Sequence, residues 1–215
     1  MSDLRTEEEQ VELLKKWWTD NGKTLIVAVV LSIAAVTGWK WWQGQVEAKG
    51  AAASSSYEQL VELMNKPTLT DEENATALHL SGELQTDHPE TLYANYAALF
   101  EAKLQVKTGE LDQALTTLKA VQKAAVNDSV SEVAALRQAQ ILWQQDKNQQ
   151  ALDLANTIKA KVYGGDLQEL KGDLLSELGK PEQAKDAYLK AKAIFAAAGV
   201  SRPVLDMKIA DLGGA

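Results

Sequence analysis

One apolar stretch near the N-terminus constrains this chain most, because it decides which solvent the residues around it meet. Sixteen residues without a formal charge, Thr24–Trp39, lie between Lys23 and Lys40. A bilayer core of about 30 Å needs roughly 20 apolar helical residues. The segment from Leu25 to Trp42 supplies 18 residues, at about 1.5 Å of helix each. The sequence therefore predicts a transmembrane helix over residues 24–42.

Aromatic and basic residues flank this stretch on both sides. Tryptophans gather where a membrane meets water, and the long stems of lysines can reach the lipid headgroups. The sequence therefore predicts six membrane-interface residues: Trp17, Trp18, Lys23, Trp39, Trp41 and Trp42. The core helix of a soluble protein, which is the alternative, has no use for tryptophan clusters at both ends.

A cleavable signal peptide would have a short, basic segment before its apolar run. Here 23 residues precede the run and include several acids, and the small residues Ala51–Ala53 that could form a cleavage site lie well beyond it. We therefore expect an uncleaved anchor. Basic residues are more frequent before the span than after it. This bias predicts a cytoplasmic N-terminus, residues 1–23, and a C-terminal domain, residues 43–215, on the outside, which in a bacterium is the periplasm.

The cytoplasmic segment is expected to form a short amphipathic helix. It would begin with Thr6 as its capping residue and end at Asn21 and Gly22, because these residue types commonly start and terminate helices. Its apolar face, which includes Leu14 and Trp18, could lie on the membrane surface or dock on a partner membrane protein. The sequence leaves both possibilities open.

Residues 43–215 are numerous enough for one domain with its own core. They include 24 acidic and 17 basic residues, and this balance argues against binding to the phosphate backbone of a nucleic acid. Helix-favouring residues dominate, prolines are few and strand-like alternation is missing, which predicts an all-α fold. The chain has no cysteine, which is compatible with an oxidising compartment.

Within this domain, three segments of similar pattern begin at Asn95, Glu132 and Gly165, and each reads as a helix, a polar turn and a second helix. Small residues recur where two helices could cross closely: Ala102, Ala139 and Gly172 at the eighth position, and Ala114, Ala151 and Ala184 at the twentieth. The spacing brackets the tetratricopeptide period of about 34 residues. The sequence thus predicts a tetratricopeptide-like helical-hairpin solenoid, closed by a capping helix that begins at Ser201–Pro203.

We expect no catalytic, cofactor-binding or metal-binding residues. The chain lacks a cysteine nucleophile, and its two histidines, His79 and His88, have no third ligand at metal spacing. Gly164 and Gly165 form too short a glycine run to cradle a phosphate. The expected protein is not an enzyme and acts through a surface.

The register of the repeats suggests where that surface lies. In tetratricopeptide stacks the first helix of each hairpin lines a concave face that commonly binds peptides. The candidate partner groove then consists of seven residues: Tyr96, Leu99, Lys103, Val106, Leu136, Gln140 and Trp143. Trp143 is the only tryptophan outside the anchor region, and core filling is the alternative role for it.

The chain resembles the YfgM family over nearly its whole length, most weakly at residues 50–80. At the N-terminus the resemblance lies in an amphipathic segment, Asn21–Lys23, the apolar run and a tryptophan-rich exit. Further on it lies in the segments ELDQALTTL, GDLLSELGKPEQAKDAY and MKIADL. The resemblance implies an ancillary subunit of the SecYEG translocon in a Gram-negative inner membrane. Such a subunit is single-pass and carries a periplasmic tetratricopeptide-like domain without catalytic residues.

The resemblance also implies partners. They are the SecYEG translocon, the membrane-anchored prolyl isomerase PpiD and, through periplasmic chaperone traffic, unfolded secreted proteins. Two other functions stay open at this point. One is a scaffold for a different envelope complex, and the other is a chaperone that binds unfolded clients directly.

Overall fold

The computed structural model describes residues 7–212, and every regular element within that range is an α-helix. The predicted all-α fold is confirmed. The chain divides into two compact units, Met1–Ala52 and Ala53–Ala215. Helix α1 (Glu7–Met64) supplies the described part of the first unit, and its last residues belong to the second.

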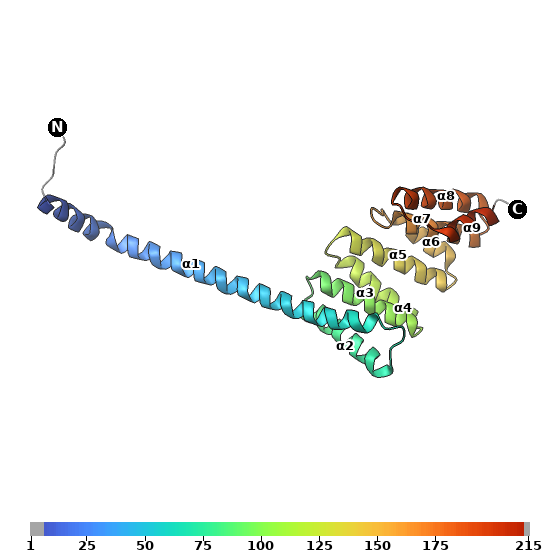
Figure 1. Ribbon diagram of the computed structural model, residues 1–215, viewed down its shortest axis with the longest axis horizontal. Helices are drawn as coiled ribbons and strands as arrows, with labels where there is room; N and C mark the ends of the chain where they lie inside the picture. The colour runs from blue at the N-terminus through green and yellow to red at the C-terminus, as the bar shows by residue number, and fades with distance from the viewer. Residues whose placement is uncertain (1–6, 213–215) are drawn as a thin grey trace, which may run out of the picture. The chain divides into compact units, whose positions relative to one another are not determined.

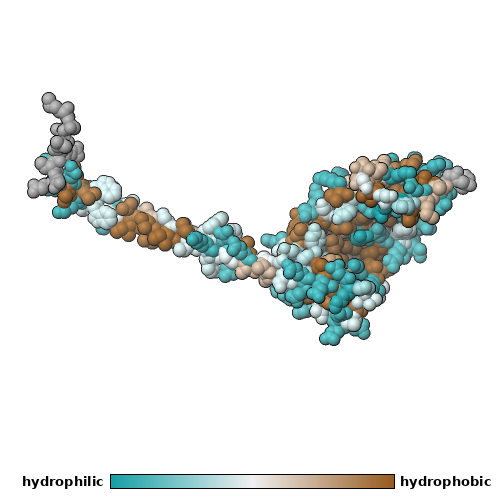
Figure 2. All heavy atoms as spheres, in the orientation of Figure 1, coloured by the Kyte–Doolittle hydropathy of each residue, from teal (hydrophilic) through white to brown (hydrophobic). Residues whose placement is uncertain are grey.

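Within the first unit, α1 carries a stretch that is long and apolar enough to cross a membrane. The candidate helix, Glu9–Met64, includes the predicted span, and the large apolar side chains from Leu25 to Trp42 are exposed. Figure 2 shows them as an apolar band with hydrophilic side chains on either side. A continuous exposed apolar surface of this kind marks a site that meets a membrane or another protein.

The expected end of a helix at Asn21 and Gly22 is wrong, because α1 passes through both residues. The Asn21 side-chain amide donates to the carbonyl oxygen of Trp17 at 3.1 Å, and the Trp18 ring lies against Gly22. One glycine costs a helix interior only about 1 kcal/mol. The favourable residues on both sides outweigh that cost. The predicted cap, Thr6, lies outside the described residues.

The second unit contains the predicted hairpins, stacked one upon the next (Figure 1). After the end of α1, α2 (Asp71–Asp87) begins with a capping box between Thr70 and Glu73. The hairpins that follow are α3 (Leu92–Lys107) with α4 (Leu111–Lys123), α5 (Asp128–Gln144) with α6 (Asn148–Thr157), and α7 (Gly164–Glu177) with α8 (Pro181–Ala197). A last helix, α9 (Pro203–Asp211), packs against α8.

The three hairpins share one turn geometry. At the equivalent place in each turn, Gly109, Asp146 and Gly179 have φ values of 83°, 59° and 69°. The N–H of the next residue donates to a carbonyl oxygen five residues earlier, at 2.7 to 2.9 Å. This is the bonding pattern of a helix that ends in a left-handed residue. The repeat is therefore built into the backbone as well as into the side chains.

The small residues at the eighth and twentieth positions lie where the sequence places them, between the helices of each hairpin. Ala114, Ala151 and Ala184 are fully buried, and a Cβ atom at Gly172 would overlap the ring of Tyr188. Helix α9 also contributes to the core of the stack. Leu205 is 1% exposed and joins the core that α5 to α8 form, so α9 covers the open end of the stack.

Candidate interaction groove

A groove of about 530 Å³ opens between α3 and α5. Two residues of its floor are deeply buried: Leu118 on α4 is 1% exposed and Ile141 on α5 is 4% exposed. Half-buried apolar side chains form the walls: Leu99, Phe100, Val106 and Val133. Figure 2 shows apolar side chains gathered on the surface of this part of the second unit. The groove thus offers an apolar surface that remains open to solvent.

The charged side chains that line the groove are both basic. Lys103 and Arg137 are exposed at the groove, and Gln140 and Gln144 complete its polar lining. Arg137 Nη1 donates to Gln140 Oε1 at 2.7 Å, which fixes the guanidinium against α5. Neither Lys103 nor Arg137 forms an ion pair with a carboxylate among the described residues. Both charges are therefore free to meet a ligand.

The structure brings together four of the seven residues expected in the groove: Leu99, Lys103, Val106 and Gln140. Tyr96 is 37% exposed, and its ring centroid lies 6.1 Å from that of Tyr57 on α1. Tyr96, Leu136 and Trp143 do not line the groove. Leu136 is 3% exposed, and Trp143 packs on the same core, which agrees with the alternative role considered for it.

Leu136 and Trp143, both on α5, lie outside the groove for a common physical reason. A middle helix such as α5 has a neighbour on each side, and Leu136 belongs to the core cluster shared with α7. Sequence reasoning also missed Leu118, Val133, Arg137 and Ile141 as lining residues. Val133 holds in the second segment the place that Tyr96 holds in the first, so the repeat register contained a signal for it.

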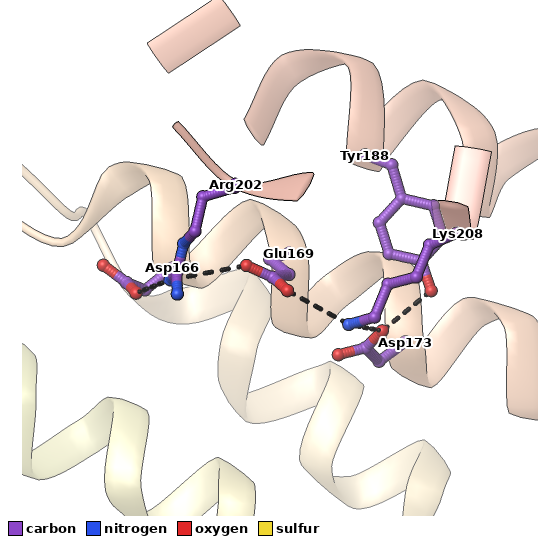
Figure 3. A network of polar contacts seen from close by, with 6 residues as sticks. All are labelled: Asp166, Glu169, Asp173, Tyr188, Arg202 and Lys208. Carbon is purple, nitrogen blue, oxygen red and sulfur yellow. Dashed lines mark hydrogen bonds and ion pairs between the residues drawn. The ribbon is translucent and has the colours of Figure 1, made fainter. Parts of the chain in front are cut away.

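On α7 the equivalent face is acidic and is already covered. Figure 3 shows Asp166, Glu169 and Asp173 on this helix facing two basic residues of the C-terminal segment. Arg202 lies 2.7 Å from Asp166 and 3.4 Å from Glu169. Lys208 on α9 lies 3.1 Å from Glu169 and 2.6 Å from Asp173. These four ion pairs link the C-terminal segment to α7.

The protonation of two groups is tied to this contact. Burial raises the pKa of Tyr188, and the hydrogen bond that its hydroxyl donates to Asp173 at 2.8 Å raises it further. Burial alone would lower the pKa of Lys208, but hydrogen bonds to Asp173 and Glu169 outweigh it, so the pKa of Lys208 is raised. In both cases the folded protein favours the protonated form.

We expect the contact between α9 and α7 to weaken in alkaline solution. A raised pKa stabilises the fold fully below the ordinary pKa values, 10.0 for tyrosine and 10.5 for lysine, and loses that effect as pH rises further. The free energy of unfolding, measured by urea titration at several pH values above and below about 10, should fall across that range. It should fall less steeply in Tyr188→Phe. Equal slopes for the two proteins would contradict the assigned role of Tyr188.

Comparison with known proteins identifies the class first. A family model described as a tetratricopeptide repeat-like domain matches residues 15–214. A crystal structure of a tetratricopeptide repeat protein from Parabacteroides merdae is similar in fold, with a TM-score of 0.53 and 15% sequence identity. That similarity covers 74% of this chain and 61% of the other. The chain has a tetratricopeptide repeat-like fold, in agreement with the hairpin stack.

Three curated relatives share the name ancillary SecYEG translocon subunit. The protein of Aggregatibacter actinomycetemcomitans is 30% identical over 86% of this chain and 88% of its own length. The Haemophilus influenzae protein is 28% identical over 84% of this chain and 89% of its own length. The Escherichia coli K12 protein is 26% identical over 87% of this chain and 88% of its own length. The chain belongs to the YfgM family of ancillary SecYEG translocon subunits.

Proposed function

We propose that this protein is a membrane-tethered interaction module that associates with the SecYEG translocon in the bacterial inner membrane. The observation that carries the proposal is the open groove between α3 and α5, which offers buried apolar floor residues and free polar groups to a protein segment. Ligand sites of this kind are concave and mostly apolar, with a few polar groups that orient what binds. Membership of the translocon-subunit family supplies the setting.

In this proposal residues 24–42 cross the membrane, residues 1–23 lie in the cytoplasm and residues 43–215 lie in the periplasm. The exposed apolar band of α1 supports the span, and the excess of Lys and Arg before it supports the orientation. Anchoring holds the groove close to the translocon. A tethered site meets its partner at a high effective concentration, so even a weak groove contact becomes occupied.

The proposed occupants of the groove are segments of proteins that gather at the translocon exit. They are PpiD and secreted chains that emerge unfolded, which would make the protein a link between secretion and periplasmic chaperones. The protein itself contributes binding and positioning in this account, and no chemical step.

Purification of the full-length protein in mild detergent, followed by mass spectrometry, tests the association. We expect the SecYEG subunits and PpiD to be recovered with the wild type. A variant whose residues 24–42 are replaced by an unrelated membrane helix should lose the translocon, because the replacement removes specific helix contacts and keeps the tether.

The same purification tests the groove. The groove variant Val133→Glu should keep the translocon and lose PpiD, whereas Leu189→Glu, on an exposed site of α8, should keep both. Absence of every translocon subunit from the wild-type sample would contradict the proposal.

Single introduced cysteines test the orientation, because the natural chain has none. We expect a membrane-impermeant maleimide to label Ser201→Cys in intact spheroplasts and to label Glu12→Cys only after lysis. Both positions are exposed, so accessibility in the folded protein does not differ between them. The reverse labelling pattern would show that the orientation is wrong.

A further inference from the structure

We propose that the α3–α5 groove selects acidic amphipathic segments, that is, stretches of protein that combine apolar side chains with carboxylates. The apolar side chains would contact Leu118, Val133 and Ile141, and the carboxylates would meet Lys103 and Arg137. This inference rests on the proposed function and adds the chemistry of the ligand to it.

The first support is the local charge. The residues from Gln43 onward include 24 acidic and 17 basic residues, yet the lining of this groove has two cations and no acid. A neighbouring hollow between α2, α3 and α4 has the opposite character, since Glu101 and Glu110 line it without any Lys or Arg. Charges more than about 8 Å apart are largely screened at physiological salt. The charges that a bound ligand meets within the groove are therefore the two cations.

The second support is the way in which the protein binds its own α9. On the face of α7, the C-terminal segment buries Leu205 of α9 in the core and pairs Arg202 and Lys208 with acidic residues. The acids occupy the second, fifth and ninth positions of the third repeated segment, which correspond to Tyr96, Leu99 and Lys103 in the first. At the ninth position the charge is reversed, from Asp173 to Lys103. The same mode of docking at α3 therefore calls for apolar groups against Tyr96 and Leu99 and for a carboxylate against Lys103.

The third support is availability. Lys103 and Arg137 are exposed and form no ion pair with a described carboxylate, so a ligand need not displace one. Arg137 offers further N–H donors beside the one that Gln140 accepts. Gln140 and Gln144 add amide groups for the backbone of the ligand. A charge-assisted contact of this kind fixes the register of an otherwise apolar docking event.

The test uses the full-length protein in detergent micelles and three fluorescent synthetic peptides. The peptides share one pattern of apolar residues and carry Glu, Gln or Lys at the polar positions, and binding is read as fluorescence anisotropy. We expect the Glu peptide to bind about fivefold to thirtyfold more tightly than the Gln peptide, and the Lys peptide to bind most weakly. The preference should shrink at about 1 M salt, because such pairs are screened.

Substitutions at the two cations test the assignment. The double variant K103Q/R137Q should bind the Glu and Gln peptides equally, and K103E/R137E should prefer the Lys peptide. A matched variant with the same loss of charge outside the groove, K123Q/K190Q, should bind as the wild type does. Thermal unfolding followed by circular dichroism verifies that each variant is folded, since all four side chains are exposed.

Equal binding of all three peptides that is lost in Val133→Glu would overturn the charge preference and leave the groove as a binding site. Failure of the wild type to bind any of the peptides would overturn this inference entirely. The proposed association with the translocon is measured separately, by co-purification, so a failure to bind the peptides would leave that proposal standing.

Discussion

Two arginines within the apolar stretch, V29R together with I33R, are expected to remove the protein from the membrane fraction. Both side chains are exposed on α1 within the predicted span. Each arginine near the centre of a transmembrane helix costs insertion about 3 kcal/mol, whereas each apolar residue of the stretch contributes only a few tenths. The two changes together therefore outweigh most of what favours insertion. The measurement is the fraction of protein that stays in the membrane pellet after carbonate extraction.

A matched control distinguishes the span from the rest of α1. V46R together with A48R adds the same charge to the same helix, beyond residue 42 and outside the predicted span. We expect this variant to remain in the pellet as the wild type does. If V29R/I33R also remained there, the stretch would not be the membrane anchor.

Substitution of Gly172 by leucine is expected to lower the free energy of unfolding by about 3 kcal/mol, as overpacked cores do. Even a Cβ atom at this position would overlap the ring of Tyr188. That ring cannot move aside easily. It is 3% exposed, its hydroxyl donates to Asp173 at 2.8 Å, and Lys208 Nζ lies 5.6 Å from its centre. Urea unfolding of the full-length protein, followed by far-ultraviolet circular dichroism, measures the loss.

The control for this prediction is Gly82→Ala on α2. A Cβ atom at Gly82 would meet no other atom within 4 Å. Alanine is favoured over glycine within a helix by about 0.5–1 kcal/mol, so this variant should be slightly more stable than the wild type. A Gly172→Leu protein as stable as the wild type would contradict the close packing of α7 on α8.

The hairpin stack was predictable because its requirements are local and repeat. Close helix crossings need small residues, and these recur at fixed positions such as Ala102, Ala139 and Gly172. The middle turn departs from the pattern in residue type only. Asp146 takes the left-handed conformation that Gly109 and Gly179 take in the other two turns.

The continuity of α1 through Asn21 and Gly22 was less predictable, because residues that commonly end a helix stand between two strongly helical stretches. Asn21 and Gly22 are common at helix ends, yet here Asn21 bonds back to Trp17 and Gly22 lies against Trp18. A helix that continues for several turns on both sides absorbs the cost of one glycine. The sequence alone does not set that balance.

The groove was predictable in part. Leu99, Lys103, Val106 and Gln140 follow from the register of the repeats, but Leu118 comes from a second helix that the register does not place there. The contact between the C-terminal segment and α7 could not be predicted from the sequence. Its hydrogen-bonded partners lie 36 and 39 residues apart in the chain, so only the folded arrangement brings them together.

Site-specific photo-crosslinking in living cells tests the central claim most directly. A photoreactive residue at Trp39, within the apolar span, should form a covalent product with a SecYEG subunit, and one at Lys103 should capture a periplasmic protein. A position on the outer surface of the repeat unit, Leu189, serves as the control and should yield neither product. Crosslinks from Trp39 to SecYEG would support a translocon-tethered interaction module. If neither Trp39 nor neighbouring positions of α1 gave crosslinks to SecYEG, in membranes that contain this protein and SecYEG, the result would contradict a translocon-tethered interaction module.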